Sequence, residues 1–412
     1  MTASLTRRVT RRVTLGAGLA ATVLSRSARA QRRPIRIGVL TDMNGPYAAN
    51  TGQGSITGAQ LAVEDFLKEN PDIPVELVSA DLQLKPDVAM GIAGKWIDAE
   101  GVDLITDVPL SSAAFAISDL VRQKDKLAIF TGGASAAITG ERCGPNHLHW
   151  VYDTWSMPHA VVDATVREGN DTWYFITADY AFGHSLQKDA ASFVAAANGK
   201  VMGQALAPFP GTTDFSSFLI QAKASGAKVL GLANGGIDTV NCIKQAAEFG
   251  IMKSGMKVAG LIFLIHDVHG VGLASARGVL LTEPFYWNMN AGTRAFATRY
   301  KARMNGVVPG SIHAGQYSAV THYLKAVRAV GPEKAKASGR TVMEAMKAMP
   351  TSDPLFGEGA VRKDGRVIHA MHLFEVKAPE DSKEPWDYYN LKRTVPAGDA
   401  FRPLDQGKCP LV

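Results

Sequence analysis

The strongest constraint in this sequence is a regular alternation of short apolar, strand-like segments with longer amphipathic, helix-like segments. Such alternation is typical of parallel sheets wrapped by helices. In the first part of the chain, the predicted strands span 35–40, 75–79, 104–108 and 127–131. The predicted helices between them span 55–70, 87–99 and 112–123. This part of the chain therefore predicts a βαβαβαβ lobe.

The same pattern begins again after a loop around Cys143. The predicted strands span 173–177, 200–206, 229–232, 258–265 and 278–282, and the predicted helices span 183–197, 215–225 and 239–249. Two long amphipathic helices, 293–305 and 316–330, then follow without a strand between them, as if the chain returned to the first sheet. From Asp353, short alternating stretches such as 367–376 predict a β-hairpin on the second lobe. The proline-rich end predicts an extended, pinned tail.

The N-terminal thirty residues have the layout of an export signal. Four arginines at 7, 8, 11 and 12 precede an apolar run, 15–24, and small residues favour cleavage after Ala30. Ten apolar residues are too few to span a bilayer as a helix, which needs about 20. The segment 10–15 resembles the twin-arginine pattern, so both the twin-arginine and the general secretory route remain open. We expect a periplasmic protein.

The remaining 382 residues exceed what one hydrophobic core usually supports, which predicts two lobes joined by a hinge. We expect lobe 1 to comprise 31–151 and 285–350, and lobe 2 to comprise 152–284 and 351–412. The signal carries six arginines and no acidic residue, so the mature chain has 38 basic and 38 acidic side chains. A neutral chain of this kind disfavours nucleic acid and anionic lipid as partners.

The three cysteines of an exported chain allow at most one internal disulfide. We expect Cys143 to pair with Cys409, because both stand in loop-like segments that contain proline, Cys143-Gly144-Pro145 and Cys409-Pro410. Cys242 lies in a predicted helix, where a buried free thiol is the commoner state.

The constellations that enzymes need are missing from the sequence. The glycine-rich stretch 52–58 lacks the Lys-Ser/Thr of a nucleotide loop and starts a dozen residues after the strand. The pairs His147/His149 and His266/His269 have no third ligand at a typical spacing, and no G-x-S-x-G elbow occurs. We therefore expect no enzyme activity, no cofactor and no metal.

Several motifs follow predicted strands in a specific order. They are IGVLTDMNGPY at 37–47, GAQLAVED at 58–65, PLSSA at 109–113, FTGGAS at 130–135, TADYAFG at 177–183 and ANGG at 233–236. In order and spacing they resemble the type I periplasmic binding proteins of the leucine/isoleucine/valine-binding family, over nearly the whole mature chain. The resemblance is closest to a sub-branch that includes receptors for aromatic carboxylates. It implies two Rossmann-like α/β lobes with a ligand cleft between them, and a solute receptor for an ABC importer.

The resemblance also implies where a ligand binds. The motif positions follow strands and precede helices, where open α/β sheets hold ligands and where helix N-termini favour a carboxylate. The carboxylate site falls on Ser111 or Ser112, Gly133 and Ser135. These serines have an alternative role as helix N-caps.

The second lobe contributes an aromatic lid at Phe182, with Tyr180 beside it. Phe182 departs from the family's usual tyrosine, which favours a flat or apolar ligand. Asn234 and Gly235 are expected at the ligand head group. The family's acidic partner for an amino group falls near the end of the strand 258–265, where only Asp267 is acidic, and this puts an α-amino ligand in doubt.

Further candidates for the pocket wall are polar or aromatic residues on the first lobe and on the returning segments: Tyr47, Asn50, Thr51, Tyr286, Trp287 and Tyr317. The aromatic ones have an alternative place in the core. We expect a monomeric receptor that binds a small carboxylate, with an aromatic or oxo acid favoured, by closure of the lobes, and that delivers it to a membrane permease. An amino acid receptor, a ligand sensor and an exported hydrolase are the alternatives.

Overall fold

The computed structural model describes residues 33–412, so the predicted export signal and its cleavage site lie outside the described residues. Pro34–Val412 form one compact unit. Lobe 1, as we use the term from here, is built on a five-stranded parallel sheet of order β2-β1-β3-β4-β5. Its strands are β1 (Ile35–Thr41), β2 (Val75–Asp81), β3 (Leu104–Asp107), β4 (Leu127–Phe130) and β5 (His147–His149).

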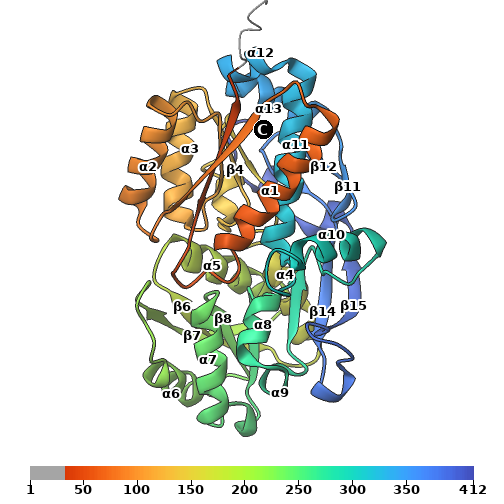
Figure 1. Cartoon of the computed structure of the whole chain (residues 1–412). Coiled ribbons are helices and arrows are strands. Elements are labelled where there is room, and N and C mark those ends of the chain that lie inside the picture. Colours follow the sequence, from red (N-terminus) through yellow and green to blue (C-terminus); the bar gives the residue numbers. More distant parts are fainter. Residues whose placement is uncertain (1–32) are drawn as a thin grey trace, which may run out of the picture. The chain divides into compact units, whose positions relative to one another are not determined.

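Helices cover both faces of this sheet (Figure 1). Because side chains alternate along a strand, Ile37 of β1 packs with Ala59 of one face, while Leu40 packs with Trp96 of the other. The first face carries α1 (Gly52–Glu69) and α11 (Ser311–Val330), with α12 (Pro332–Ala337) and α13 (Gly339–Ala348) beside α11. The other face carries α2 (Pro86–Asp98) and α3 (Ser111–Gln123). A short helix, η1 (Ala136–Thr139), follows β4.

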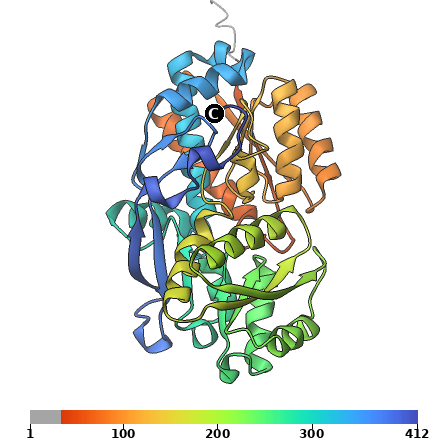
Figure 2. The same ribbon diagram turned by 180° about the vertical axis from the view of Figure 1, so that it is seen from behind.

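Lobe 2 is built on a four-stranded parallel sheet of order β7-β6-β8-β9. Its strands are β6 (Thr172–Ala178), β7 (Lys200–Ala207), β8 (Val229–Ala233) and β9 (Lys257–Gly260). Trp173 and Phe175 of β6 pack under one helical layer, and Tyr174 and Ile176 pack under the other. The first layer is α4 (Ser156–Arg167) and α5 (Ala181–Ala196), and the second is α6 (Ser216–Ala224), α7 (Ile237–Glu248) and α8 (Ile265–Val271), with η2 (Met252–Ser254) and α9 (Leu273–Ala276) nearby. Figure 2 shows the α4–α5 layer in front of this sheet.

Several segments connect the two lobes. The chain passes from lobe 1 to lobe 2 after β5, and returns after β10 (Leu280–Glu283) through α10 (Ala291–Lys301). A small sheet of β11 (Thr351–Asp353), β12 (Gly357–Val361) and β13 (Val367–Ile368) lies against β5, with a bridge between His149 and Arg366. The chain then enters lobe 2 again, where β14 (Met371–Val376) pairs with β10 and with β15 (Tyr389–Val395). The predicted stretch 367–376 is divided between β13 of the small sheet and β14, and the partner β15 lies in the segment predicted as an extended tail.

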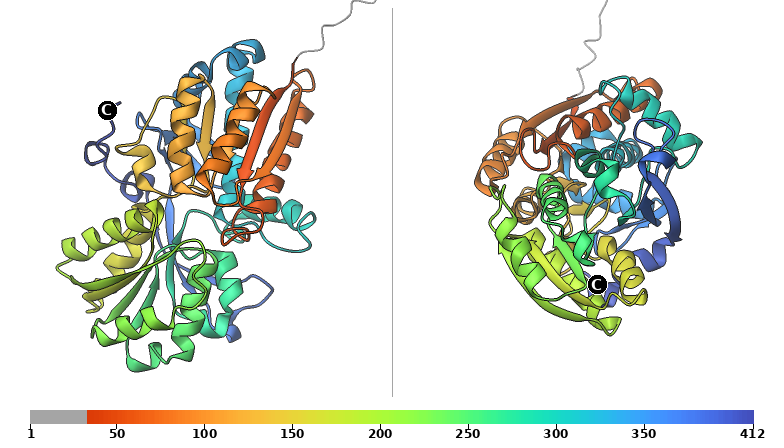
Figure 3. Two further views of the ribbon diagram at one scale, coloured as in Figure 1. Left: turned by 90° about the vertical axis from the view of Figure 1, so that its left-hand side faces the viewer. Right: turned by 90° about the horizontal axis from the view of Figure 1, so that it is seen from below.

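The C-terminal tail after β15 runs back to lobe 1, as the left view of Figure 3 shows. It contains α14 (Ala397–Ala400) and η4 (Leu404–Gln406), and η3 (Pro379–Asp381) precedes β15. A disulfide joins Cys409 to Cys143, which is the pair expected from the sequence, across a separation of 266 residues. Cys242 is free and buried. The tail is thereby fastened covalently to lobe 1.

The predicted strand 258–265 is wrong in its second half. Strand β9 ends at Gly260, and α8 begins at Ile265. The residues between them stay buried as an extended connection, and Asp267 accepts a hydrogen bond from the Leu264 amide that starts the helix. A continuous apolar run does not distinguish a buried strand from buried connections, which explains the error. The sequence patterns also missed β5 and α4, and they placed the start of α11 five residues too late, at Gln316 in place of Ser311.

Candidate functional site

A narrow cavity lies at the carboxyl ends of the strands, between the two lobes. The space inside it that can hold the centre of a water molecule is about 30 Å³, room for about two waters. The narrowness of this space indicates that the lobes stand in a closed arrangement. The cavity is lined by Tyr47, Asn50, Thr51, Pro109, Gly132, Ala134, Tyr152, Tyr180, Phe182, Gly235, Gly236, Ile262, Leu264 and Ile312.

The lining combines apolar side chains with the beginnings of helices. Thr51 and Tyr180 are the residues before the first turns of α1 and α5. Gly236 and Leu264 hold the same position for α7 and α8, and Ile312 is the second residue of α11. Helix N-termini carry unpaired N–H groups and partial positive charge. No lining residue is an Asp, Glu, Lys, Arg or His, so the wall itself supplies helix N-termini and no charged side chain. Buried carboxylates outside the lining, Asp267, Glu283 and Asp107, act electrostatically on Tyr152.

The loop between β1 and α1 brings Tyr47 to the cavity. The carboxylate of Asp42, at the end of β1, accepts hydrogen bonds from the amides of Gly45 at 2.7 Å and Tyr47 at 2.8 Å. The Tyr47 hydroxyl then meets the Tyr180 hydroxyl of lobe 2 at 2.6 Å. The ring of Phe209 stacks on both, with its centroid 5.4 Å from that of Tyr47 and 4.5 Å from that of Tyr180. Three aromatic rings thus close one side of the cleft.

Backbone contacts also join the lobes beside these rings. The Ile237 amide of α7 donates to the Pro46 carbonyl of lobe 1 at 3.1 Å. Gly236 has a φ of +60°, and a Cβ there would lie 2.3 Å from the same carbonyl oxygen. Only glycine therefore permits this approach.

A buried polar pair crosses the cleft on another side. The Asn50 Nδ2 of lobe 1 donates to Asp267 Oδ1 of lobe 2 at 2.8 Å, and Asp267 Oδ2 accepts from the Leu264 amide at 2.9 Å. Burial raises the pKa of Asp267 to about 6, although these two hydrogen bonds lower it. Asp267 is thus more easily protonated than an exposed aspartate. It lies behind the lining, not in it.

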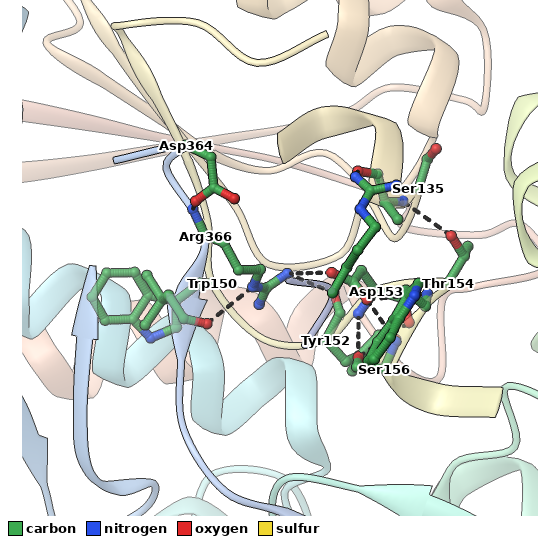
Figure 4. A network of polar contacts seen from close by, with 12 residues as sticks. Ser135, Trp150, Tyr152, Asp153, Thr154, Ser156, Asp364 and Arg366 are labelled. Carbon is green, nitrogen blue, oxygen red and sulfur yellow. Dashed lines mark hydrogen bonds and ion pairs between the residues drawn. The ribbon is translucent and has the colours of Figure 1, made fainter. Parts of the chain in front are cut away.

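A polar network fixes the first crossing between the lobes, next to Tyr152 (Figure 4). Arg366 is fully buried, and its Nη1 donates to the Tyr152 carbonyl at 3.2 Å and contacts Asp153 Oδ2 at 3.4 Å. Asp153 Oδ1 accepts from the Ser156 amide at 2.7 Å, at the start of α4. The hydroxyl of Thr154 donates to Asp189 of α5 at 2.7 Å. The crossing peptide that presents Tyr152 to the cavity is thus held from both lobes.

Six of the residues predicted from the sequence line this cavity together: Tyr47, Asn50, Thr51, Tyr180, Phe182 and Gly235. They come from the β1–α1 loop of lobe 1 and from the ends of β6 and β8 of lobe 2. The structure therefore brings together residues that lie nearly 190 positions apart in the sequence.

The predicted carboxylate residues Ser111, Ser112, Gly133 and Ser135 do not line the cavity. The Ser111 Oγ accepts a hydrogen bond from the Ser135 amide at 3.2 Å, and the Ser135 Oγ accepts from the Ala137 amide at 3.3 Å and caps η1. Both serines thus support the two loops whose Pro109, Gly132 and Ala134 form the wall. In this closed form Ser135 is a helix N-cap, which is the alternative role that the sequence left open for it.

Five other predicted residues also lie away from the lining. The Asn234 amide accepts from the Thr239 hydroxyl at 2.7 Å inside lobe 2, and Asp267 lies behind the wall. The hydroxyl of Tyr286 donates to the Trp386 carbonyl at 3.3 Å, and that of Tyr317 donates to Asp65 at 3.0 Å. Trp287 is likewise buried against Trp386. The expectation that Tyr286, Trp287 and Tyr317 line the pocket is wrong, because these side chains pack in the core. A place in the core was the alternative that the sequence left open for them.

Sequence patterns missed eight lining residues: Pro109, Gly132, Ala134, Tyr152, Gly236, Ile262, Leu264 and Ile312. Gly132, Ala134 and Gly236 are immediate neighbours of predicted residues. The motifs therefore indicated these loops, but not the residue of each loop that lines the cavity. Ile262, Leu264 and Ile312 are apolar and carry no signal that separates a pocket wall from a core. Tyr152 reaches the cavity only because the chain crosses between lobes there.

In each histidine pair, one ring nitrogen lies against a backbone carbonyl. His147 Nε2 lies 2.9 Å from the Ile138 carbonyl, and His266 Nε2 lies 3.0 Å from the Val308 carbonyl. Within residues 33–412, no group of three or more His, Cys, Asp and Glu side chains is placed to hold a metal ion. In that same part of the chain, no helix is both long and apolar enough to cross a membrane.

Comparison with known proteins assigns the chain to a family. A family model described as periplasmic binding protein matches residues 34–383, and no curated protein matches. The solved structure of a periplasmic binding protein from Burkholderia mallei shares 42% sequence identity and a TM-score of 0.86, covering 92% of this chain and 99% of that chain. A branched chain amino acid ABC transporter periplasmic ligand-binding protein from Burkholderia xenovorans LB400 shares 40% identity and a TM-score of 0.80, with the same coverage.

More distant structures share only the fold. One is a solute binding protein of an ABC transporter from R. palustris in complex with 4-hydroxybenzoate, at 20% identity and a TM-score of 0.79, covering 89% of this chain and 98% of that chain. The chain belongs to the periplasmic binding protein family, whose members are the solute-binding, non-enzymatic components of ABC transporters. The resemblance drawn from the sequence motifs is thereby confirmed.

Proposed function

We propose that this receptor captures a small carboxylic acid without an amino group, an aromatic or 2-oxo acid, in the cavity between its lobes. The observation that carries the proposal is the wall at the end of β9. The resemblance expects an acidic partner for an amino group there, and the residues that line the cavity are Ile262 and Leu264. An ammonium group placed against them would be buried without a counter-charge, which is costly.

The rest of the lining supports the same ligand class. Phe182 and the aromatic rings of Tyr47 and Tyr180 offer flat apolar contact. The convergent helix N-termini supply partial positive charge for a carboxylate. We expect the carboxylate to dock on the lobe 1 loops that contain Pro109, Gly132 and Ala134, next to Ser111 and Ser135.

We further propose how the receptor works in the cell. The acid docks on lobe 1 and lobe 2 closes over it. Side chains of the wall move aside to give it more room than the about 30 Å³ of this structure, while the Tyr47–Tyr180 and Asn50–Asp267 hydrogen bonds hold the closed form. A membrane permease then recognises the closed receptor. The signal at 1–30, with its paired arginines, supports export to the periplasm by the twin-arginine or the general secretory route.

A branched-chain amino acid receptor is the second candidate, and two observations favour it. The Burkholderia xenovorans relative is described as a branched chain amino acid transporter component. Two buried carboxylates, Asp267 and Asp238, also lie behind the lining, and burial raises the pKa of Asp238 to about 7. In the closed form, however, Asp267 is already bonded to Asn50 and Leu264.

A thermal-shift screen of the mature chain tests the proposal, because a ligand that binds the native state raises the melting temperature. The panel contains benzoates, 2-oxo acids and aliphatic amino acids. A shift with the aromatic or oxo acids supports the proposal. A shift with leucine or valine alone contradicts it and favours the second candidate.

A further inference from the structure

Asn50 has an unusual hydrogen-bonding state for a residue of the cavity wall. Its side chain is 5% exposed, and its Nδ2 donates to Asp267 in the opposite lobe. Its Oδ1 is buried and accepts no hydrogen bond from any residue in the described part of the chain. Buried polar atoms without partners are rare in native structures, and each one calls for an explanation. Asn146 Oδ1, away from the cavity, is also without a partner, so it is the place of Asn50 in the cavity wall that points to a hydrogen-bond donor on the ligand.

The orientation of this amide is set by Asp267, because the partners of an amide decide which of its ends is nitrogen. An ionised carboxylate only accepts hydrogen bonds. Asp267 Oδ2 is occupied by the Leu264 amide, so Oδ1 requires a donor from Asn50. Asp267 lies outside the lining while Asn50 lies in it. The nitrogen of Asn50 is thus committed to Asp267, and the oxygen is the atom of this amide that remains to meet a ligand.

Neighbouring polar groups do not replace the missing donor. The Tyr47 and Tyr180 hydroxyls bond to each other at 2.6 Å. The Thr51 hydroxyl donates to the Tyr47 carbonyl at 3.0 Å. The donor for Asn50 therefore comes from outside the protein.

We propose that Asn50, oriented by Asp267, is a specificity-determining residue that accepts a hydrogen bond from a ligand hydroxyl, so that the preferred ligand is a hydroxylated carboxylic acid. This inference rests on the proposed function, which supplies the carboxylate class. A hydroxyl suits the site better than an ammonium, because Asn50 is neutral and the lining holds no carboxylate. The two residues belong to different lobes, so recognition of the hydroxyl is completed only on closure.

The test compares acids that differ by one hydroxyl. Isothermal calorimetry is run at pH 7.5 with benzoate and the three hydroxybenzoates, and with 3-phenylpropanoate and 3-phenyllactate. At least one hydroxylated acid is expected to bind about tenfold more tightly than its parent. In Asn50→Leu this ratio falls to near one. Because the ratio compares two ligands in the same variant, a general loss of lobe closure affects both affinities and cancels. The melting temperature of each variant confirms that it folds.

The matched control is Asn146→Leu. Asn146 is also a buried amide that donates to an aspartate, Asp125, at 3.0 Å, but it does not line the cavity. The hydroxyl preference is expected to persist in this variant. Its loss there would overturn the assignment to Asn50.

A second variant, Asp267→Asn, is expected to reverse the orientation of the Asn50 amide. Its side-chain oxygen accepts from the Leu264 amide, and its nitrogen donates to Asn50 Oδ1, which turns the Asn50 nitrogen toward the ligand. The preference is then expected to pass from the hydroxy acid to the oxo acid of the same skeleton, 3-phenyllactate to phenylpyruvate, by about tenfold. An unchanged order in this variant overturns the inference.

The outcomes separate this inference from the function on which it rests. If carboxylic acids bind and the hydroxyl has no effect in the unmodified protein, the inference fails and the proposed function stands. If phenylalanine binds and neither phenyllactate nor phenylpyruvate does, both fail.

Discussion

The hydroxyls of Tyr47 and Tyr180 meet at 2.6 Å across the cleft, and the ring of Phe209 stacks on both side chains. Tyr47 comes from the β1–α1 loop of lobe 1, while Tyr180 precedes α5 of lobe 2. This contact exists only while the lobes are closed. Retention of the ligand therefore depends in part on a hydrogen bond between the two lobes, in which the ligand takes no part.

Removing one of these hydroxyls is expected to shorten the lifetime of the complex. In Tyr180→Phe, the Tyr47 hydroxyl loses its partner at a cost of about 1 kcal/mol, which corresponds to roughly a fivefold faster dissociation. Stopped-flow displacement of a bound acid measures this rate. Tyr174→Phe, a buried tyrosine of β6 outside the cavity, is the control. An unchanged dissociation rate in Tyr180→Phe would show that the contact does not hold the cleft shut.

Placing a carboxylate in the cavity wall is expected to change the ligand class. Ile262→Glu supplies the acidic group that the wall after β9 lacks. The affinity for leucine relative to 4-methyl-2-oxopentanoate should rise by about tenfold or more, since a close ion pair in a closed site offsets the burial of the ammonium. Ile262→Val is the control for packing. If the two variants give the same ratio, this wall does not decide between amino and oxo acids.

Glu283 is expected to make stability fall as the pH rises. It is fully buried, it accepts from the Ser311 hydroxyl at 2.5 Å and the Tyr389 hydroxyl at 2.7 Å, and burial raises its pKa to about 8 from an ordinary 4.5. The folded state thus binds the proton more tightly than the unfolded state, so stability decreases between pH 4.5 and 8 and levels off above.

The variant Glu283→Gln isolates this contribution from other buried acids. Asp107, Asp238 and Asp267, whose pKa values are also raised by burial, keep their effect in the variant. Melting temperatures from pH 5 to 9 should decline less steeply in Glu283→Gln than in the unmodified protein. Parallel curves would mean that Glu283 does not titrate in this range.

The disulfide between Cys143 and Cys409 is expected to stabilise the whole fold by fastening the tail to lobe 1. It closes a long loop, so Cys143→Ser with Cys409→Ser should lower the free energy of unfolding by about 2–5 kcal/mol. Urea unfolding measures the loss. Cys242→Ser is the control, because that thiol is buried and free. A midpoint shift no larger than that of the control would contradict a stabilising role.

The sequence predicted the two-lobed α/β fold because its apolar periodicity is strong wherever strands such as Ile35–Thr41 alternate with helices such as Gly52–Glu69. It also pointed to the loops after β1, β6 and β8, which contribute residues to the cavity between the lobes. It did not resolve which residue of a loop faces inward. Ser111 and Ser135 bond within and between their loops, while their neighbours Pro109, Gly132 and Ala134 form the wall.

Other parts of the site depend on long-range packing, which local patterns do not contain. The helix α4 has Pro158 in its first turn, where proline is tolerated, and its apolar pattern was overlooked. Asp267 was found as the acidic residue nearest the end of β9. That it turns to Asn50, 217 positions earlier, follows only from the closed arrangement of the lobes.

The central claim, that the cavity takes an acid without an amino group, is tested most directly by calorimetry with isosteric pairs. The pairs are 4-methyl-2-oxopentanoate with leucine and phenylpyruvate with phenylalanine, which differ only in the group on the second carbon. The account predicts that the oxo acid of at least one pair binds tenfold or more tightly than its amino acid, because no lining residue pairs with an ammonium. Tighter binding of leucine or phenylalanine than of its oxo analogue would contradict the account.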